Sequence, residues 1–149
     1  MRSFVVISLA ALVAYTIACT CKTKTLEEMY CESDYVARVL ITGFGPGPNA
    51  NYTSYTFSTV RNFKINNDTN VDPTAAAYSQ FITPSTSATC EIQWLSPGRE
   101  YVINTEETPA NALYTNICLQ FPLTNQSSEY TDALTQKVQT FSQDPTICQ

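Results

Sequence analysis

The sequence has no histidine, and only eight of its 149 residues are basic. The absence of histidine excludes Ser-His-Asp catalysis, Cys-His catalysis and every metal site that uses an imidazole ligand. The thirteen acidic residues give a formal net charge of -5, which argues against nucleic acid as a partner because phosphate binding requires a basic face. The chain also lacks internal repeats and low-complexity linkers, and its length suits one domain.

Long apolar segments are missing after the first eighteen residues, so we expect no membrane span. Within residues 1–18, Arg2 provides a positive start, residues 4–13 form a short apolar stretch, and Thr16 and Ala18 place small residues before a cut. This pattern predicts a secretory signal peptide cleaved after Ala18, in preference to a membrane anchor or a buried first helix. We therefore predict a secreted, extracellular protein.

All six cysteines lie in the predicted mature domain, residues 19–149. They are Cys19, Cys21, Cys31, Cys90, Cys118 and Cys148. In an oxidising compartment an even number of cysteines predicts a disulfide framework of three bonds, but six cysteines allow fifteen connectivities. A metal site built on Cys19 and Cys21 is the weaker alternative because histidine is absent.

Three N-glycosylation sequons agree with export. They begin at Asn51, Asn67 and Asn125 and have no proline at their middle position. The alternative is that these sequons occur by chance, since the chain is rich in Asn and Thr. In a secreted protein we expect at least one of these asparagines to carry a glycan and to lie at the surface.

Two helices are predicted, one at each end of the domain. A capping-box pattern from Thr25 to Glu28 predicts a short helix over residues 26–33. Near the carboxy terminus, apolar side chains recur every three or four residues, which is one face of a helix, and Ser127 or Ser128 can cap it. That face consists of Tyr130, Leu134, Val138 and Phe141.

Between the helices the sequence predicts short strands. The predicted strands are residues 35–41, 52–65, 78–83, 91–95, 100–105 and 113–119. Composition predicts loops at residues 43–49 and 66–73 and a turn at residues 96–98. Arg61 indicates either a bulge or a barrel edge in the long second strand. Five or six strands with flanking helices indicate a small, mainly-β barrel, of which the OB-type barrel is one form.

The cysteine spacing carries a resemblance to a known family. The domain starts with Cys19-Thr20-Cys21, Cys31 follows, and Asp34-x-Val36-x-Arg38 opens the first predicted strand. The chain resembles the amino-terminal domain of the tissue inhibitors of metalloproteinases, a branch of the netrin-like (NTR) domains. The resemblance implies an OB-type five-stranded barrel with flanking helices. It also implies the disulfides Cys19–Cys90, Cys21–Cys118 and Cys31–Cys148.

The same resemblance implies a secreted inhibitor of zinc metalloproteinases of the matrix metalloproteinase type. The α-amino group and carbonyl oxygen of Cys19 would bind the catalytic zinc of the protease, so the chain would need no cofactor of its own. Thr20 would point into the specificity pocket of the protease. The other implied contact residues are Cys21 and Lys22 along the cleft, with Ser87, Ala88 and Thr89 as a second edge.

One residue departs from the family pattern, and one other function class remains open. Lys22 stands where an apolar residue is common, so we expect altered selectivity. A non-inhibitory netrin-like protein, either an immunomodulatory (anti-inflammatory) ligand or a module that binds a cell-surface receptor, is the alternative function. An enzyme is disfavoured for two reasons. Adjacent carboxylates, here residues 27–28 and 106–107, more often lie on the solvated surface than in an active site. Without histidine or a free thiol, the sequence also offers no nucleophile paired with a general base.

Overall fold

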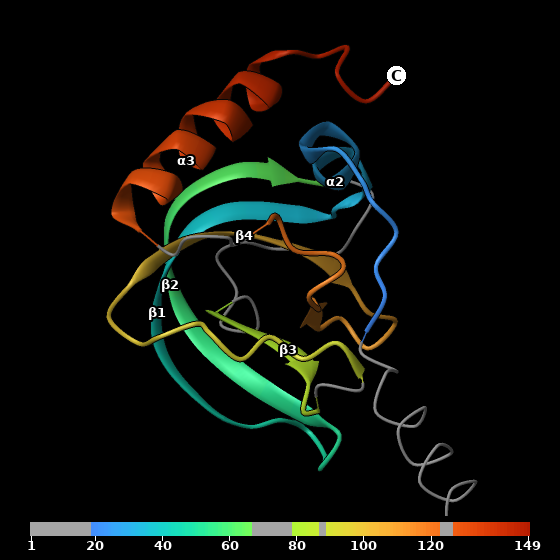
Figure 1. Cartoon of the computed structure of the whole chain (residues 1–149), viewed down its shortest axis with the longest axis vertical. Helices are drawn as coiled ribbons and strands as arrows, with labels where there is room; N and C mark the ends of the chain where they lie inside the picture. The colour runs from blue at the N-terminus through green and yellow to red at the C-terminus, as the bar shows by residue number, and fades with distance from the viewer. Residues whose placement is uncertain (1–18, 67–78, 87–88, 123–126) are drawn as a thin grey trace, which may run out of the picture.

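The computed structural model describes residues 19–66, 79–86, 89–122 and 127–149 and shows a closed five-stranded β-barrel with two flanking helices (Figure 1). The elements are α2 (Leu26–Glu32), β1 (Tyr35–Pro46), β2 (Tyr52–Ile65), β3 (Gln80–Pro84), β4 (Glu100–Glu107), β5 (Leu113–Tyr114) and α3 (Ser128–Gln143). The strand order around the barrel is β1-β2-β3-β5-β4, and β4 pairs with β1 to close it. The pairs are antiparallel except β3 with β5, which is parallel. This architecture confirms the predicted mainly-β, OB-type barrel.

The barrel has an apolar interior and a second apolar layer outside β1 and β4. Because side chains alternate along a strand, Val39 and Ile103 face the interior, whereas Val36 and Val102 face outward. The outward pair is fully buried because α3 lies across that face of the barrel (Figure 1). The two layers explain why β4 is buried along most of its length.

Both helices begin as predicted. Thr25 caps α2: its hydroxyl accepts a hydrogen bond from the Glu28 main-chain N–H, and the Glu28 carboxylate accepts one from the Thr25 N–H. Ser127 caps α3 through the N–H of Tyr130. The predicted apolar face of α3 is buried at Leu134, Val138 and Phe141, and Tyr130 is partly buried beside it. Among the helices in the described ranges, no helix has the length and apolar character needed to cross a bilayer.

The first hairpin is longer than the sequence predicts. Composition indicates a loop over residues 43–49, but β1 continues through Pro46 and pairs with β2 up to Thr53. The turn itself is confined to residues 47–51. A side chain at Gly47 would collide with the next strand, since a Cβ there would lie 2.7 Å from the Tyr52 carbonyl oxygen. The predicted bulge in β2 is confirmed, because the β1–β2 register shifts on both sides of Arg61.

Two predicted strands are wrong in whole or in part. Residues 91–95 form no strand and pair with none of the strands in the described ranges, and their apolar side chains, Ile92 and Leu95, are buried in the barrel core. Residues 113–119 contribute only the two-residue β5. The chain turns there because the Asn116 side-chain oxygen accepts the main-chain N–H groups of Cys118 and Leu119. The predicted strand at residues 78–83 is β3, shifted to end at Pro84, and most of the predicted loop at residues 66–73 lies outside the described residues.

Candidate functional site

Two disulfides attach the segment before α2 to the barrel. Cys19 bonds to Cys90 with a Cα–Cα distance of 5.3 Å, and Cys21 bonds to Cys118 with a Cα–Cα distance of 5.1 Å. The segment therefore runs beside the chain that follows β5 (Figure 1). The third disulfide joins Cys31 of α2 to Cys148 after α3. The three bonds are the pairs that the resemblance implies.

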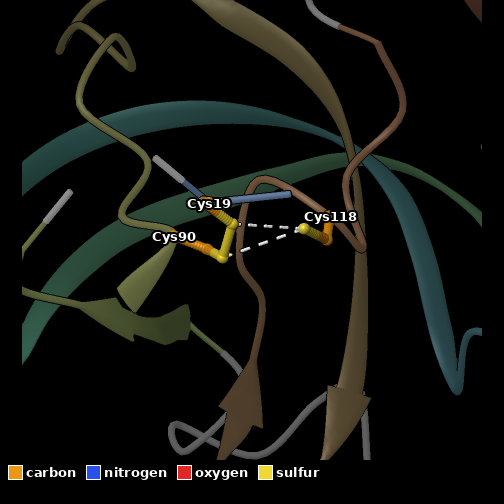
Figure 2. Close-up of side chains that lie close together, drawn as sticks. All are labelled: Cys19, Cys90 and Cys118. Carbon is orange, nitrogen blue, oxygen red and sulfur yellow. Dashed lines mark hydrogen bonds between the residues drawn. A yellow bond between two sulfur atoms is a disulfide. The ribbon is translucent and has the colours of Figure 1, made fainter. Parts of the chain in front are cut away.

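The first two disulfides lie against each other. The Cys118 sulfur is 3.3 Å from the Cys19 sulfur and 3.8 Å from the Cys90 sulfur (Figure 2). Three cysteine sulfurs this close together resemble a metal-binding cluster. However, each of them already forms a disulfide, so none is the thiolate that a metal would require. The cluster is therefore a structural crosslink between three segments of the chain.

The predicted protease-contacting residues lie mostly at the surface. Cys19 is partly buried, and Thr20, Cys21 and Lys22 are exposed. Thr89, from a segment about 70 residues away, is also exposed and adjoins the Cys19–Cys90 bond. We call these residues, 19–22 together with 89–90, the cysteine ridge. Ser87 and Ala88, the other two predicted contact residues, lie outside the described residues.

Main-chain hydrogen bonds shape the loop that carries Thr89 and Cys90. The Thr86 carbonyl oxygen accepts the N–H groups of Thr89 at 3.0 Å and Glu91 at 3.2 Å, so Thr86 is bonded to the residues on both sides of Cys90. Cys90 has a positive φ of 70°, a conformation uncommon for a non-glycine residue. Its carbonyl oxygen accepts the N–H of Ile117 at 3.0 Å. The two loops that hold the partners of Cys19 and Cys21 are thereby joined to each other.

Asn104 of β4 holds the loop that follows Cys118 through side-chain hydrogen bonds. The sequence analysis did not identify this residue. Its side-chain amide donates to the Ser33 hydroxyl at 3.1 Å and to the Leu119 carbonyl oxygen, and its side-chain oxygen accepts the Phe121 N–H at 2.8 Å. Asn104 is 1% exposed. The signal was an asparagine in a strand buried on both faces, where an unpaired amide would be costly. These bonds fix the chain just after Cys118.

Electrostatic contacts fix the other end of the segment, where it enters α2. Lys24 forms an ion pair with Glu32, and the capping box follows at once. The hydrogen bond from the Thr25 main-chain N–H is the largest of the effects that hold the pKa of Glu28 below its usual value. Lys22 and Lys24 contribute in the same direction. The segment from residue 19 to residue 25 is thus anchored at both ends.

The adjacent carboxylates at residues 27–28 and 106–107 lie within elements of the fold, at the start of α2 and at the end of β4. Glu27 and Glu28 lie in the first turn of α2, where negative charge is favourable. Burial raises the pKa of Glu106, and nearby Asp34 adds to the effect. The Asp34 carboxylate accepts the Glu107 main-chain N–H at 2.8 Å, so it connects the start of β1 to the end of β4.

One of the three predicted glycosylation sites can be placed. Asn51 is exposed in the turn between β1 and β2. Asn67 and Asn125 lie outside the described residues. Asn51 also lines a groove that reaches Thr89 of the cysteine ridge.

Comparison with known proteins gives the same family as the cysteine pattern. A family model described as "Tissue inhibitor of metalloproteinase" matches residues 17–143. The chain is also 28% identical over 127 residues to a Caenorhabditis elegans protein named "Putative metalloproteinase inhibitor tag-225", with 79% of this chain and 77% of that protein covered. Proteins of this family inhibit metalloproteinases and are not enzymes. With the barrel and the tethered ridge on one chain, these matches show that the protein belongs to the tissue inhibitor of metalloproteinase family.

Proposed function

We propose that the mature chain, beginning at Cys19, inhibits secreted zinc metalloproteinases of the matrix metalloproteinase type by binding their catalytic zinc. The ligands are the α-amino nitrogen and the carbonyl oxygen of Cys19. The observation that carries the proposal is the double tether: Cys19 and Cys21 are both bonded to the barrel, and Thr20 between them is exposed. The zinc belongs to the protease, and the chain has no resident metal in this account.

The chemistry follows from the two atoms that Cys19 offers. An α-amine and the carbonyl oxygen of the same residue close a five-membered ring with a metal ion. In a zinc protease this pair displaces the water that the enzyme uses as its nucleophile. The ordinary pKa of an α-amine is about 8, so it loses its proton readily beside a divalent cation. The proposal requires cleavage after Ala18, because only a mature terminus at Cys19 has this amine.

Rigidity of the ridge favours tight binding. In the chain-entropy model, bonds that close loops of 71 and 97 residues are worth roughly 4 to 5 kcal/mol each when taken alone. An untethered terminus would fray and would lose that freedom on binding. Since the disulfides have already removed the conformational freedom of the terminus, less entropy is lost on binding and more of the contact energy appears as affinity.

The remaining ridge residues are proposed as contacts along the protease cleft. Thr20 enters the specificity pocket, and Cys21 and Lys22 follow as a product peptide would. Thr89 forms a second edge, with Ser87 and Ala88 preceding it in the chain. The lysine at position 22 lowers affinity for proteases with an apolar subsite there.

Secretion is part of the proposal. It is supported by the signal-peptide pattern of residues 1–18 and by three disulfides, which persist in oxidising compartments. The proteases named above are extracellular, so inhibitor and target would share a compartment.

The test is a titration of the processed protein against a panel of matrix metalloproteinase catalytic domains. The amino terminus is first read by mass spectrometry, and only material that begins at Cys19 is used. We expect tight inhibition of at least one enzyme, competitive with a small zinc-binding hydroxamate. Thr20→Gly serves as a matched variant that should weaken inhibition and leave zinc binding intact. If correctly processed protein inhibits no enzyme in the panel, the immunomodulatory or receptor-binding function becomes the leading one.

A further inference from the structure

A groove lies between the first hairpin and the cysteine ridge. Its volume is about 450 Å³, and it is lined on one side by Asn51 and Tyr52 and on the other by Thr86 and Thr89. Tyr114 of β5 also lines it, and the rings of Tyr52 and Tyr114 meet edge to face with centroids 6.5 Å apart. The groove therefore offers aromatic surface and threonine hydroxyls directly beside the ridge.

Asn51 is held at the rim of this groove by its main chain. The Asn51 carbonyl oxygen accepts the Ser85 N–H at 2.9 Å, and the Ser85 hydroxyl donates to the Ala50 carbonyl oxygen at 2.9 Å. The Asn51 N–H donates to the side chain of Asn49 at 3.0 Å. Ser85 leads directly into the loop that carries Thr89. The attachment point of a group on the exposed Asn51 side chain is thus held beside the ridge.

We propose that Asn51 carries an N-linked glycan and that this glycan occupies the groove and limits which proteases can reach the cysteine ridge. Asn51-Tyr52-Thr53 is a complete sequon on an exposed turn. The faces of aromatic rings pack well against the C–H faces of sugars. The Thr86 and Thr89 hydroxyls hydrogen-bond to each other at 2.8 Å and keep acceptor lone pairs to which sugar hydroxyls can donate. The part of the proposal that concerns proteases rests on the function proposed above, whereas the glycan and its position do not.

The expected effect of the glycan is selectivity. It is bulky and sits on the Thr89 side of the ridge, so it obstructs proteases whose surface rises on that side of the cleft. Proteases with an open surface there bind the same ridge without a clash. Specificity of this kind comes from an added steric conflict with some partners and not from a new attraction to others.

The first experiment asks whether the glycan is present and where it lies. The parent protein and Asn51→Gln are secreted from the same eukaryotic cells, and peptides are mapped after removal of N-glycans in ¹⁸O-water. We expect ¹⁸O-labelled aspartate at position 51 in the parent. Amide hydrogen exchange at Tyr52, Ser85 and Thr86 should be slower in the glycosylated parent than in Asn51→Gln or the deglycosylated parent. An unmodified Asn51, or equal exchange in all three proteins, would overturn the proposal.

The second experiment measures inhibition constants across the protease panel. Asn51→Gln and the deglycosylated parent should bind some proteases at least tenfold more tightly and others within twofold of the parent. Thr53→Ser keeps the sequon and should behave as the parent does. Equal constants for every enzyme, with loss of the glycan verified by mass, would refute the effect on selectivity. If no form inhibits any enzyme, the function proposed above and its selectivity effect both fail, and the exchange data still decide the position of the glycan.

Discussion

Replacing Asn104 with alanine should destabilise the barrel by about 3 to 5 kcal/mol. The asparagine side chain is 1% exposed and makes three hydrogen bonds, two of them to main-chain groups of the loop after Cys118. Alanine would leave the Phe121 N–H and the Leu119 carbonyl oxygen without their partner. Each buried group left unsatisfied costs about 1 to 3 kcal/mol, and a small cavity adds to this sum.

The measurement is urea unfolding with the disulfides intact, with the free energy taken at an unchanged dependence on denaturant. Asn62→Ala is a matched control, since Asn62 is exposed and accepts one hydrogen bond from the Tyr35 hydroxyl, which also contacts Thr59. We expect the control to stay within about 1 kcal/mol of the parent. If Asn104→Ala also stays within that range, the buried amide is not what holds this loop, and the account of the ridge support is wrong.

Three further predictions concern the helices. Leu134→Ala removes a buried side chain that packs α3 on the barrel and should cost roughly 2 to 5 kcal/mol in thermal or chemical unfolding, whereas exposed Gln136→Ala should cost little; equal effects would show that α3 is not docked. Lys64→Met should cost roughly 1 to 3 kcal/mol in urea, because the Lys64 ammonium donates to two carbonyl oxygens at the end of α2, and an unchanged midpoint would refute this. Glu28→Gln should lower stability at neutral pH. The lowered pKa of Glu28 means that its ionised form stabilises the fold above the unfolded-state pKa, and this contribution is lost as the pH falls through the folded-state pKa. The difference in stability between Glu28→Gln and the parent should therefore vanish in acid. A stability difference that does not depend on pH would contradict this role of the Glu28 charge.

The parts of the fold that depend on local patterns were predictable. The capping box at Thr25 and the apolar period of α3 each involve residues within one or two helical turns, so the sequence displays them directly. The long strand β2 was predicted from its alternation, and the charge of Arg61 on the apolar parity marked the irregular register.

Strand pairing was predicted less well because it depends on distant partners. Residues 91–95 have the composition of a strand, but among the described residues the barrel closes through β1, β2, β3, β5 and β4 without them, and Ile92 and Leu95 pack into its core without pairing. Conversely, the glycines and proline of residues 43–46 indicate a loop, yet the facing residues 53–56 of β2 hold them in a hairpin.

The candidate site was predictable where it is continuous in sequence or crosslinked by cysteines. Residues 19–22 follow one another, and the family resemblance supplied their link to Cys90. Asn104 was missed because its three partners come from distant segments, at Ser33, Leu119 and Phe121. Nothing in the local pattern of β4 brings those groups together.

The proposed inhibition depends on Cys19 binding the zinc of a target protease through its α-amine. The most direct measurement compares inhibition by the parent protein with that of a variant carrying one additional alanine before Cys19. The extra residue separates the free amine from the Cys19 carbonyl oxygen and places bulk at the metal, while the three disulfides and the barrel are untouched. We expect the extended protein to unfold at the same temperature as the parent and to inhibit no longer. Inhibition of the same enzymes with unchanged affinity by the extended protein would contradict zinc binding as the mechanism.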